Sequence, residues 1–329
     1  MRDVAGQAGV SLKTVSRVIN GEPGVARATS ERVADAVAAL GFQRNDIARN
    51  LRRGRSTATL GLIIEDVANP FYSLVAQAVE AAAGARGFLL ITGSCEEDPA
   101  RERALATALL RRRVDAMLIV PAGDDHRYLV DELGTGTPAV FLDRPPVGIE
   151  ADAVLFDDAA GARRAVEHLV AHGHRRIACL ADAAGVHTAR ERRAGYAEAL
   201  AAAGLAPDRA LVPPGQHDAG AAEAAARELL ALAPARRPTA LFCANNRNTV
   251  GALRALRDRP EPMALVGFDD FELAELLPVP VTVVRSDPHR LGATAAELAF
   301  DRLDGDDRPA QRIVLPVELV PRGSGELAA

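Results

Sequence analysis

Apolar and polar positions follow two different patterns along this chain. From Thr59 onward, short continuous apolar runs such as LGLII (60–64) alternate with stretches of helical spacing. Continuous apolar runs are typical of strands buried on both faces, as in parallel sheets covered by helices. The pattern predicts strands at 60–64, 88–91, 116–120, 139–143, 176–180, 240–244 and 264–268, and helices at 71–85, 97–111, 159–172, 187–203, 218–232 and 247–257. Since roughly 270 residues are too many for one sheet, we expect an α/β core of two lobes with a ligand between them.

The first 43 residues carry helical spacing without strands. Helices are expected over 3–8, 12–20 and 27–40, with a Gly9-Val10 turn after the first and Ser11 as the N-cap of the second. Three short helices around a small apolar cluster, the second following a Gly-containing turn, form the helix-turn-helix arrangement. The pattern therefore predicts a DNA-binding unit at the N-terminus.

An arginine-rich segment, RNDIARNLRRGR (44–55), separates these two parts. Only Ile47, Ala48 and Leu51 offer an apolar stripe, so the segment buries too little surface to fold alone. We expect it to become ordered on DNA or against its twin in a dimer.

Charge is distributed unevenly between the head and the body. Residues 1–55 hold ten basic and five acidic side chains, a net charge of +5, whereas the other residues hold 29 bases and 39 acids, a net charge of −10. A basic head on an acidic body is typical of a protein whose first segment meets a polyanion. Charge alone leaves open the alternative of a solvated basic face without a partner.

Composition argues against several classes of protein. No apolar run approaches the ~18–20 residues that span a bilayer, and the N-terminus lacks the apolar stretch of a signal peptide. The three cysteines, at 95, 179 and 243, contain no C-x-x-C pair. Such usage indicates reduced thiols in the cytosol, so we expect a cytoplasmic protein without disulfides and without membrane contact.

The segments of this pattern resemble the lactose-repressor (LacI/GalR) family of bacterial transcription regulators. The likeness runs in the family's order through AGVSLKTVSRVIN (8–20), ERVADAVAALGF (31–42), NDIARNLRRGR (45–55), LGLIIEDVANPF (60–71), FLDRP (141–145), EHLVAHGHRRIA (167–178), RERRAGY (190–196) and VGFDD (266–270). Each string is weak by itself, and the ordered set is specific.

The resemblance implies a domain organisation and a function. The domains would be a helix-turn-helix head at 1–43, a hinge helix and linker at 44–57, and an effector-binding and dimerisation core at 58–329 similar to periplasmic sugar-binding proteins. Three crossings would join the core's lobes, approximately 58–157 plus 285–315 and 158–284 plus 316–325. The protein would be a homodimeric repressor of a palindromic double-stranded DNA operator, controlled by a small sugar-like effector, and not an enzyme.

Departures from the family's usual sequence keep other functions open. The usual Thr-Ile pair before the first helix is missing, so either that helix lacks its cap or the true start lies upstream of Met1. Ala26 replaces the Ser that caps the third helix, and Arg44 replaces the Pro that precedes the hinge. The alternatives are a cytosolic sugar-binding protein whose head no longer binds DNA, an enzyme acting on a sugar, and a regulator that needs a phosphoprotein partner.

The second helix of a helix-turn-helix lies in the major groove. Arg17 is expected to contact guanine O6 and N7, and Leu12 a thymine methyl. Lys13 contacts either a base or a phosphate. Thr14 and Ser16 are interpreted as phosphate-facing or structural.

The resemblance also implies DNA contacts from the hinge, at Asn45, Ala48 and Leu51. Leu51 occupies the family's position for an apolar wedge in the minor groove. Such a wedge unstacks a base step and bends the duplex.

Polar residues follow several of the predicted strands, where open α/β lobes bind ligands. By resemblance, Phe71, Arg192, Asn245 and Asp269 match positions that contact effectors, although Phe71 could instead belong to the core. Asn246 stands where the family often has Asp. Carboxylate, amide, guanidinium and aromatic groups together suit a pentose, a hexose, a glycoside or a nucleoside. The expected effector-binding residues are Asp66, Asn69, Phe71, Asp143, Arg144, Arg192, Asn245 and Asp269.

Two signals imitate enzyme sites. His168, His172 and His174 have a spacing that metal ligands can have, yet no Glu or Cys completes a known ligand set, and the segment resembles a family junction without metal. The adjacent acids Asp157-Asp158 and Asp269-Asp270 imitate glycosidase carboxylates, which must flank the scissile bond at ~5–10 Å. Neither a metal nor a cofactor is therefore expected.

Overall fold

A computed structural model describes residues 1–19, 23–41, 56–130, 136–257, 259 and 262–329. The chain divides into two compact units, 1–57 and 58–329, and each is described by itself. The predicted hinge contacts Asn45, Ala48 and Leu51 lie outside the described residues.

The described residues of the N-terminal unit form the helices α1 (Arg2–Ala8), α2 (Leu12–Ile19) and α3 (Arg27–Ala39). The predicted cap of α2 is confirmed, because Ser11 Oγ accepts a hydrogen bond from Thr14 N at 3.1 Å. Gly9 makes the turn between α1 and α2 with a left-handed φ of 63°. The helices pack around a small core that includes Val4, Val15 and Val33.

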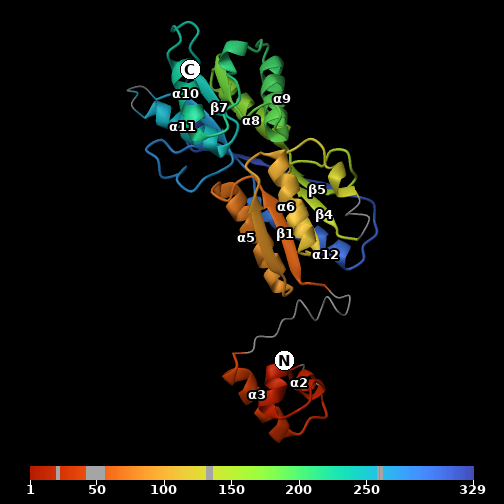
Figure 1. The fold of residues 1–329 in the computed structure, drawn as a ribbon. Coiled ribbons are helices and arrows are strands. Elements are labelled where there is room, and N and C mark those ends of the chain that lie inside the picture. The colour runs from red at the N-terminus through yellow and green to blue at the C-terminus, as the bar shows by residue number, and fades with distance from the viewer. Residues whose placement is uncertain (20–22, 42–55, 131–135, 258, 260–261) are drawn as a thin grey trace. The chain divides into compact units, whose positions relative to one another are not determined.

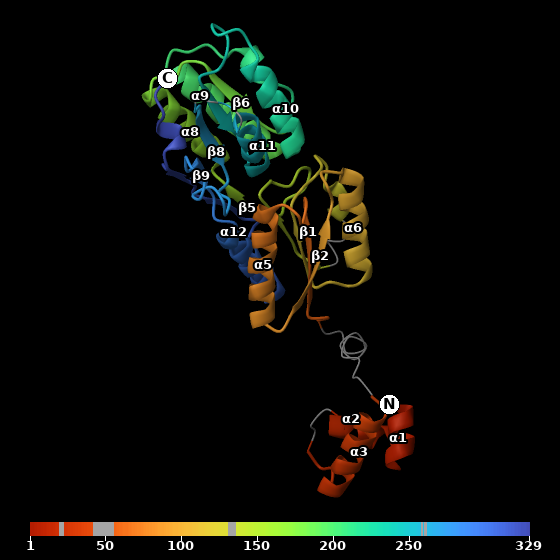
Figure 2. The same ribbon diagram turned by 90° about the vertical axis from the view of Figure 1, so that its left-hand side faces the viewer.

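The core unit contains two sheets (Figures 1 and 2). The first has the order β10-β5-β4-β3-β1-β2 and is parallel throughout. The second has the order β11-β9-β8-β7-β6 and is parallel except for β11, which pairs antiparallel with β9. The strands are β1 (Thr59–Ile64), β2 (Leu89–Ser94), β3 (Ala116–Ile119), β4 (Ala139–Leu142), β5 (Asp152–Phe156), β6 (Ile177–Leu180), β7 (Ala240–Cys243), β8 (Ala264–Phe268), β9 (Thr282–Arg285), β10 (Arg312–Leu315) and β11 (Glu318–Val320).

Helices cover both faces of each sheet, as the continuous apolar strands predict. Helices α5 (Pro70–Ala85) and α12 (Pro288–Leu303) pack with the face of the first sheet that carries Leu62 and Leu118. Helix α6 (Pro99–Arg111) packs on the opposite face, which carries Ile63 and Met117. In the second sheet, the helices of one face are α8 (Asp158–Ala171) and α9 (His187–Ala202), and those of the other are α10 (Ala219–Leu230) and α11 (Asn246–Leu256). The predicted α/β fold is confirmed.

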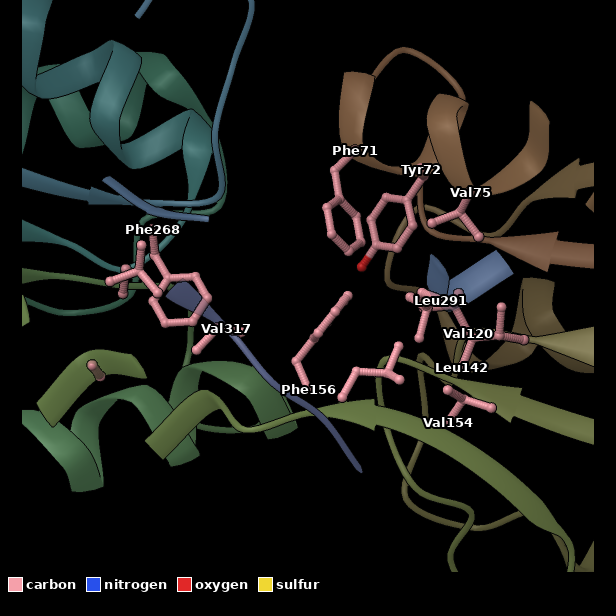
Figure 3. Close-up of a cluster of buried hydrophobic side chains, with 14 of the residues drawn as sticks. Phe71, Tyr72, Val75, Val120, Leu142, Val154, Phe156, Phe268, Leu291 and Val317 are labelled. Atoms are coloured by element: carbon pink, nitrogen blue, oxygen red, sulfur yellow. The ribbon is translucent and has the colours of Figure 1, made fainter. Parts of the chain in front are cut away.

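The chain crosses between the lobes three times, from β5 to α8, from β9 to α12 and from β10 to β11. One apolar cluster continues through these crossings. Phe156, at the end of β5, lies between Phe71 and Tyr72 of α5 on one side and Phe268 and Val317 on the other (Figure 3). The rings of Phe71 and Phe156 have centroids 6.2 Å apart, and Phe268 of the second lobe belongs to the same cluster, so the two lobes share a packed seam.

Candidate effector cleft and DNA-reading helix

A polar cavity lies between the lobes at the carboxyl ends of the strands. The first lobe lines it with Glu65, Asn69, Phe71, Tyr72, Asp143 and Arg144. The second lobe lines it with Asp182, Thr188, Ala189, Arg192, His217, Ala244, Asn245, Asn246, Arg247 and Asp269. Seven of the eight predicted effector residues therefore come together in one cavity. Asp66 is the eighth. It does not line the cavity, but it accepts a hydrogen bond from Arg247, which does.

Two of the cleft carboxylates are held by a strained backbone. Asp143 follows β4 with a φ of 65°, and Asp269 follows β8 with a φ of 63°. Residues other than glycine rarely adopt this left-handed conformation, which costs on the order of 1–3 kcal/mol and clusters at functional sites. In this conformation, one carboxylate from each lobe lines the cavity between them.

The two Nη atoms of Arg144 are engaged by carboxylate and carbonyl oxygens, whereas its buried Nε has no hydrogen-bond partner among the described residues. Its Nη1 donates to Glu97 Oε2 and to Pro121 O, each at 2.7 Å, and its Nη2 donates to Glu97 Oε1. Its Nε lies 3.7 Å from Asp143 Oδ2, which accepts a hydrogen bond from Tyr72 Oη at 3.1 Å. Burial raises the pKa of Asp143, and burial with the nearby Asp143 charge raises the pKa of Tyr72 well above its ordinary value, so Tyr72 remains a donor.

Arg192 connects two carboxylates of the second lobe. Its Nε donates to Asp158 Oδ1 at 2.7 Å, and its Nη1 donates to Asp269 Oδ2 at 3.1 Å. The guanidinium stacks 3.7 Å above the centre of the Phe268 ring, an arrangement that fixes its plane. Asp269 Oδ1 accepts a further bond from Ser286 Oγ at 2.6 Å. Burial raises the pKa of Asp158 to about 7 despite the arginine beside it.

Arg247 and Asn246 bridge the lobes across the cleft. Arg247 Nη1 donates to Glu65 Oε1 at 2.9 Å, and its Nη2 donates to Asp66. Asn246 Nδ2 donates to Asn69 Oδ1 at 2.8 Å. With these bridges in place the cavity has a volume of about 40 Å³, which suits a few waters rather than a sugar ring. A sugar would therefore have to separate the bridges or replace them.

Other cleft-lining residues were not predicted from the sequence, namely Glu65, Tyr72, Asp182, Thr188, His217 and Arg247. Asp182 lies two residues after the end of β6, just as Asp66 lies two residues after the end of β1, so the strand-end rule that found the other carboxylates also applied to it. Asn245 Nδ2 donates to Asp182 Oδ2 at 2.6 Å. Asn245 Oδ1 accepts from Asn248 N at 2.7 Å and caps α11.

Phe71 belongs both to the core and to the cleft wall. It is 8% exposed, packs edge-on against Tyr72 with ring centroids 5.0 Å apart, and lines the cavity. Asp270, beside Asp269, is not among the cavity-lining residues. It pairs with Arg322 at 2.6 Å, and its Oδ1 accepts from Phe271 N.

The three histidines of the H-x3-H-x-H pattern are occupied by protein partners. His168 Nε2 contacts Glu326, and His172 Nδ1 contacts the carbonyl of His168. His174 bonds Thr239 and the carbonyl of Leu327. Within the described part of the chain, no group of three His, Cys, Asp or Glu side chains could hold a metal ion.

In the N-terminal unit, the start of α2 presents the predicted DNA-reading residues. Leu12 is 47% exposed and Lys13 is exposed, whereas Ser16 and Arg17 are half-buried. Thr14 Oγ1 lies 2.9 Å from Ser11 Oγ. Arg17 Nη2 donates to Pro23 O at 2.6 Å, so its guanidinium would have to leave that carbonyl to reach a base. As for membranes, no helix among the described residues is both long and apolar enough to cross one.

The sequence matches two known family models. Residues 1–45 match the model described as bacterial regulatory proteins, lacI family, and residues 166–325 match the periplasmic binding protein-like domain. The chain is 36% identical over 336 residues to the transcriptional regulator CelR of Thermobifida fusca, covering 98% of this chain and 97% of that protein. It is 30% identical over 329 residues to the transcriptional repressor PurR of Aliivibrio fischeri, covering 98% and 97%. These relatives are transcription regulators and not enzymes.

Solved structures share the fold of this chain over nearly its whole length. The Lac repressor dimer bound to operator and the anti-inducer ONPF superposes with a TM-score of 0.84 at 29% identity, covering 98% of both chains. The CelR–cellobiose complex superposes with a TM-score of 0.73 at 34% identity, also covering 98% of both chains.

Proposed function

Because this chain belongs to the LacI family of bacterial regulatory proteins, we propose that it represses transcription as a homodimer on a palindromic operator, under the control of a polyol effector. The observation that carries this proposal is the interlobe cleft, where strained carboxylates, arginines and amides from both lobes converge. The proposed domains are a DNA-reading head at 1–43, a hinge at 44–57 and an effector-binding core at 58–329.

The head reads DNA through α2. Its N-terminal residues Leu12 and Lys13 are exposed, as residues that enter the major groove must be. Arg17 lies one turn further along the helix, and its guanidinium can donate two hydrogen bonds to guanine O6 and N7. The family match at residues 1–45 supports this assignment.

A second copy of the chain would cover an open apolar groove on the core. The apolar part of the groove is formed by Pro70 and Leu74 from the start of α5 and by Phe271 from the loop after β8, and charged residues such as Glu272 and Arg285 line the rest. The same loop exposes Leu273 and Leu276, the latter by 71%. Contiguous exposed apolar surface of this kind marks protein interaction sites. The Lac repressor to which the chain is similar is a dimer, which supports a second copy as the occupant.

The effector would act by linkage between the lobes and the hinge. A sugar that displaces the Arg247 and Asn246 bridges changes the arrangement of the lobes, and DNA favours the arrangement in which the hinge helices form. Each ligand then alters the affinity of the other by the same factor, commonly worth about 1–3 kcal/mol. CelR and its cellobiose complex support a sugar as the class of effector.

Selection of random duplex DNA by the purified chain tests this function. Enrichment of a palindrome with a central pyrimidine–purine step is the expected result, and it supplies the probe for screening sugars. The second candidate is a sugar-binding protein that no longer reads DNA, which is favoured by the missing side-chain caps of α1 and α3. Failure to enrich any site, with sugar binding retained, would establish that candidate instead.

A further inference from the structure

Two loops of the first lobe, 120–126 after β3 and 143–151 after β4, are tied to each other at two points. At the first point, Arg144 Nη1 donates a hydrogen bond to Pro121 O at 2.7 Å. At the second point, the backbone N–H of His126 donates to Val147 O at 2.9 Å, and the Val147 N–H donates to His126 Nδ1 at 3.0 Å. Both ties join backbone atoms of one loop to the other, so the two loops should move together.

The link between Val147 and Arg144 is short and stiff, because Pro145 and Pro146 fill it. A proline ring fixes φ and so removes the freedom with which a chain absorbs a displacement. Arg144 lines the interlobe cavity. A change in the contact between His126 and Val147 would therefore be passed on to a residue of the cavity wall.

His126 is fully buried, and its two ring nitrogens have different surroundings. Because Nδ1 accepts a hydrogen bond from the Val147 N–H, the neutral ring carries its hydrogen on Nε2. Nε2 has no hydrogen-bond partner among the described residues and lies 3.6 Å from Glu102 Oε1. The ring packs edge-on against Phe141 of β4, with centroids 5.0 Å apart. A buried ring N–H that lacks an acceptor is costly, so packing alone does not account for a histidine at this position.

Glu102 of α6 is the carboxylate beside this ring. It is 1% exposed, its Oε1 accepts a hydrogen bond from Tyr128 Oη at 2.6 Å, and its Oε2 accepts one from Ala122 N at 2.6 Å. Among the described residues, His126 is the basic side chain within ion-pair distance of it. A buried carboxylate without a cation is stabilised when one is supplied, and a protonated His126 would supply it.

The other charged or titratable groups around the ring are, by element, Asp124 and Asp125 of its own loop, Tyr128 of the 3₁₀ helix η1 (Arg127–Leu129) and, beyond the Tyr128 ring, Arg103 of α6. Hydrogen bonds from Arg127 hold the pKa of Asp125 well below its usual range. Burial raises the pKa of Tyr128, which therefore remains a hydrogen-bond donor. Since Asp124 is exposed and Asp125 is paired, Glu102 is the buried acid whose charge a protonated His126 would neutralise.

Protonation of His126 would improve one contact and break another. The second hydrogen goes to Nδ1, where it faces the Val147 N–H across 3.0 Å. Two N–H groups cannot form a hydrogen bond with each other, so Val147 has to move away. On the other side of the ring, Nε2 becomes part of a cation beside Glu102. Burial lowers the pKa of His126 below its ordinary value, and the Glu102 carboxylate opposes that shift.

From this geometry we infer that His126 is a positioning residue for the interlobe cavity: its neutral ring holds Val147, and through it Arg144, in the described arrangement, and its protonation releases them. The inference rests on the proposed function in one respect, because it takes the cavity as the effector site. It adds the proton as a second small ligand that controls the cavity, bound outside the residues that line it.

Hydrogen exchange of the full-length chain tests the release of Val147. Deuterium uptake by a peptide that contains Val147 is measured by mass spectrometry from about pH 5 to about pH 8 and corrected for the pH dependence of chemical exchange. Pro145 and Pro146 carry no amide hydrogen, so Val147 supplies the first amide after Arg144. In the wild type, the corrected exchange should become at least about tenfold faster as the pH falls, with a midpoint below the ordinary histidine value of about 6.5.

His126→Gln removes the titration and keeps both contacts possible, because a glutamine amide can accept from the Val147 N–H and donate towards Glu102. Its corrected exchange at Val147 should not change with pH. The matched control is His289→Gln, at an exposed position of α12, and it should behave as the wild type does. A wild type without acceleration at low pH would overturn the inference. Acceleration that persists in His126→Gln would also overturn it, since another group, such as Asp143, would then carry the response.

Nitrogen-15 NMR of the wild-type chain, labelled at histidine and arginine, covers the case in which His126→Gln does not fold. At neutral pH, Nδ1 of His126 should be unprotonated and Nε2 protonated. The Nε signal of Arg144 should shift with the same midpoint as the His126 ring. A protonated Nδ1 at neutral pH, or an Arg144 signal that does not follow the ring, would overturn the inference. These measurements use neither DNA nor an effector, so a failed operator selection and a failed assignment of His126 remain distinguishable.

Discussion

Asp143 and Asp269 occupy equivalent places in the two lobes of the core. Each follows the last residue of a central strand, each has a left-handed φ within a few degrees of the other, and the backbone N–H of each donates to a neighbouring strand at 2.9 Å, to Val154 O and Val284 O respectively. Burial raises the pKa of Asp143, and the charge of Asp269 adds to that rise. The two lobes thus place matching acids at one cavity.

Replacement of one of these acids should uncouple effector binding from DNA binding. In Asp269→Asn, the contacts with Arg192 and Ser286 lose their charge while the shape is retained, so we expect at least a tenfold weaker effector response with unchanged operator affinity. Fluorescence anisotropy of labelled operator, with and without the sugar identified by screening with that operator, measures both quantities. The exposed Asp304→Asn is the control, and an unchanged response in Asp269→Asn would move the effector site elsewhere.

Asp158 should make stability depend on pH. Its pKa is about 7 in the folded chain and near 3.9 in an unfolded one, so the native state retains a proton between these values. The contribution of Asp158 to the free energy of unfolding is therefore greatest at low pH. It falls by up to roughly 4 kcal/mol as the pH rises from about 4 to about 7. Urea unfolding of wild type and Asp158→Asn at pH 5 and pH 8 tests this, because the variant should lose less stability than wild type between the two. Equal losses would mean that Asp158 does not hold the proton.

The hydrophobic pattern predicted most of the fold because buried strands and amphipathic helices differ in their period. Among the described residues, no predicted helix or strand differs at either end by more than three residues from the observed one. Elements β5, β9, α12, β10 and β11 were not predicted. Strand β10 is largely exposed, so it lacks a continuous buried run. The antiparallel pairing of β11 with β9 depends on a crossing between lobes, which local spacing does not encode.

The cleft was predictable only in part. The strand-end rule found Asp143, Asn245 and Asp269, and family resemblance added Phe71 and Arg192. The pairing of Arg247 with Glu65 joins residues 182 positions apart, and it depends on how the lobes close rather than on any local pattern. The hinge prediction for Leu51 stays a prediction.

Arg247 should stabilise the closed cleft through Glu65. Arg247→Gln leaves the Glu65 carboxylate, which is only 9% exposed, without its cation, so we expect a loss of about 2–3 kcal/mol in the free energy of unfolding. Glu65→Gln/Arg247→Gln should recover part of this loss, because no buried charge then remains. Additive losses in this double-mutant cycle, measured by urea unfolding, would show that the bridge contributes nothing to the closed state.

Arg17 should determine sequence preference at the operator. Arg17→Ala is expected to lose roughly 1–3 kcal/mol of discrimination at one base pair of each half-site, because the guanidinium fork recognises guanine, and to keep weak binding to unrelated DNA. Competition binding with operators substituted one base pair at a time measures the preference. Arg227→Ala, in the core, is the control. Unchanged selectivity in Arg17→Ala would mean that the wild-type Arg17 contacts no base and instead binds the Pro23 carbonyl or a phosphate.

Leu276 should be part of the surface on which two copies meet. A side chain that is 71% exposed contributes little to the fold of one chain, so Leu276→Asp should leave Tm within about 2 °C at a concentration where wild type is monomeric. At higher concentration the charge would be buried against a second copy without a partner, which costs several kcal/mol, and the dimer should dissociate. Sedimentation equilibrium of wild type and variant measures the dissociation constant, with Val147→Asp, at another exposed apolar position, as control. A hundredfold weaker dimer that also loses operator affinity would tie DNA reading to this surface, whereas an unaltered dimer would place the interface on another face of the core.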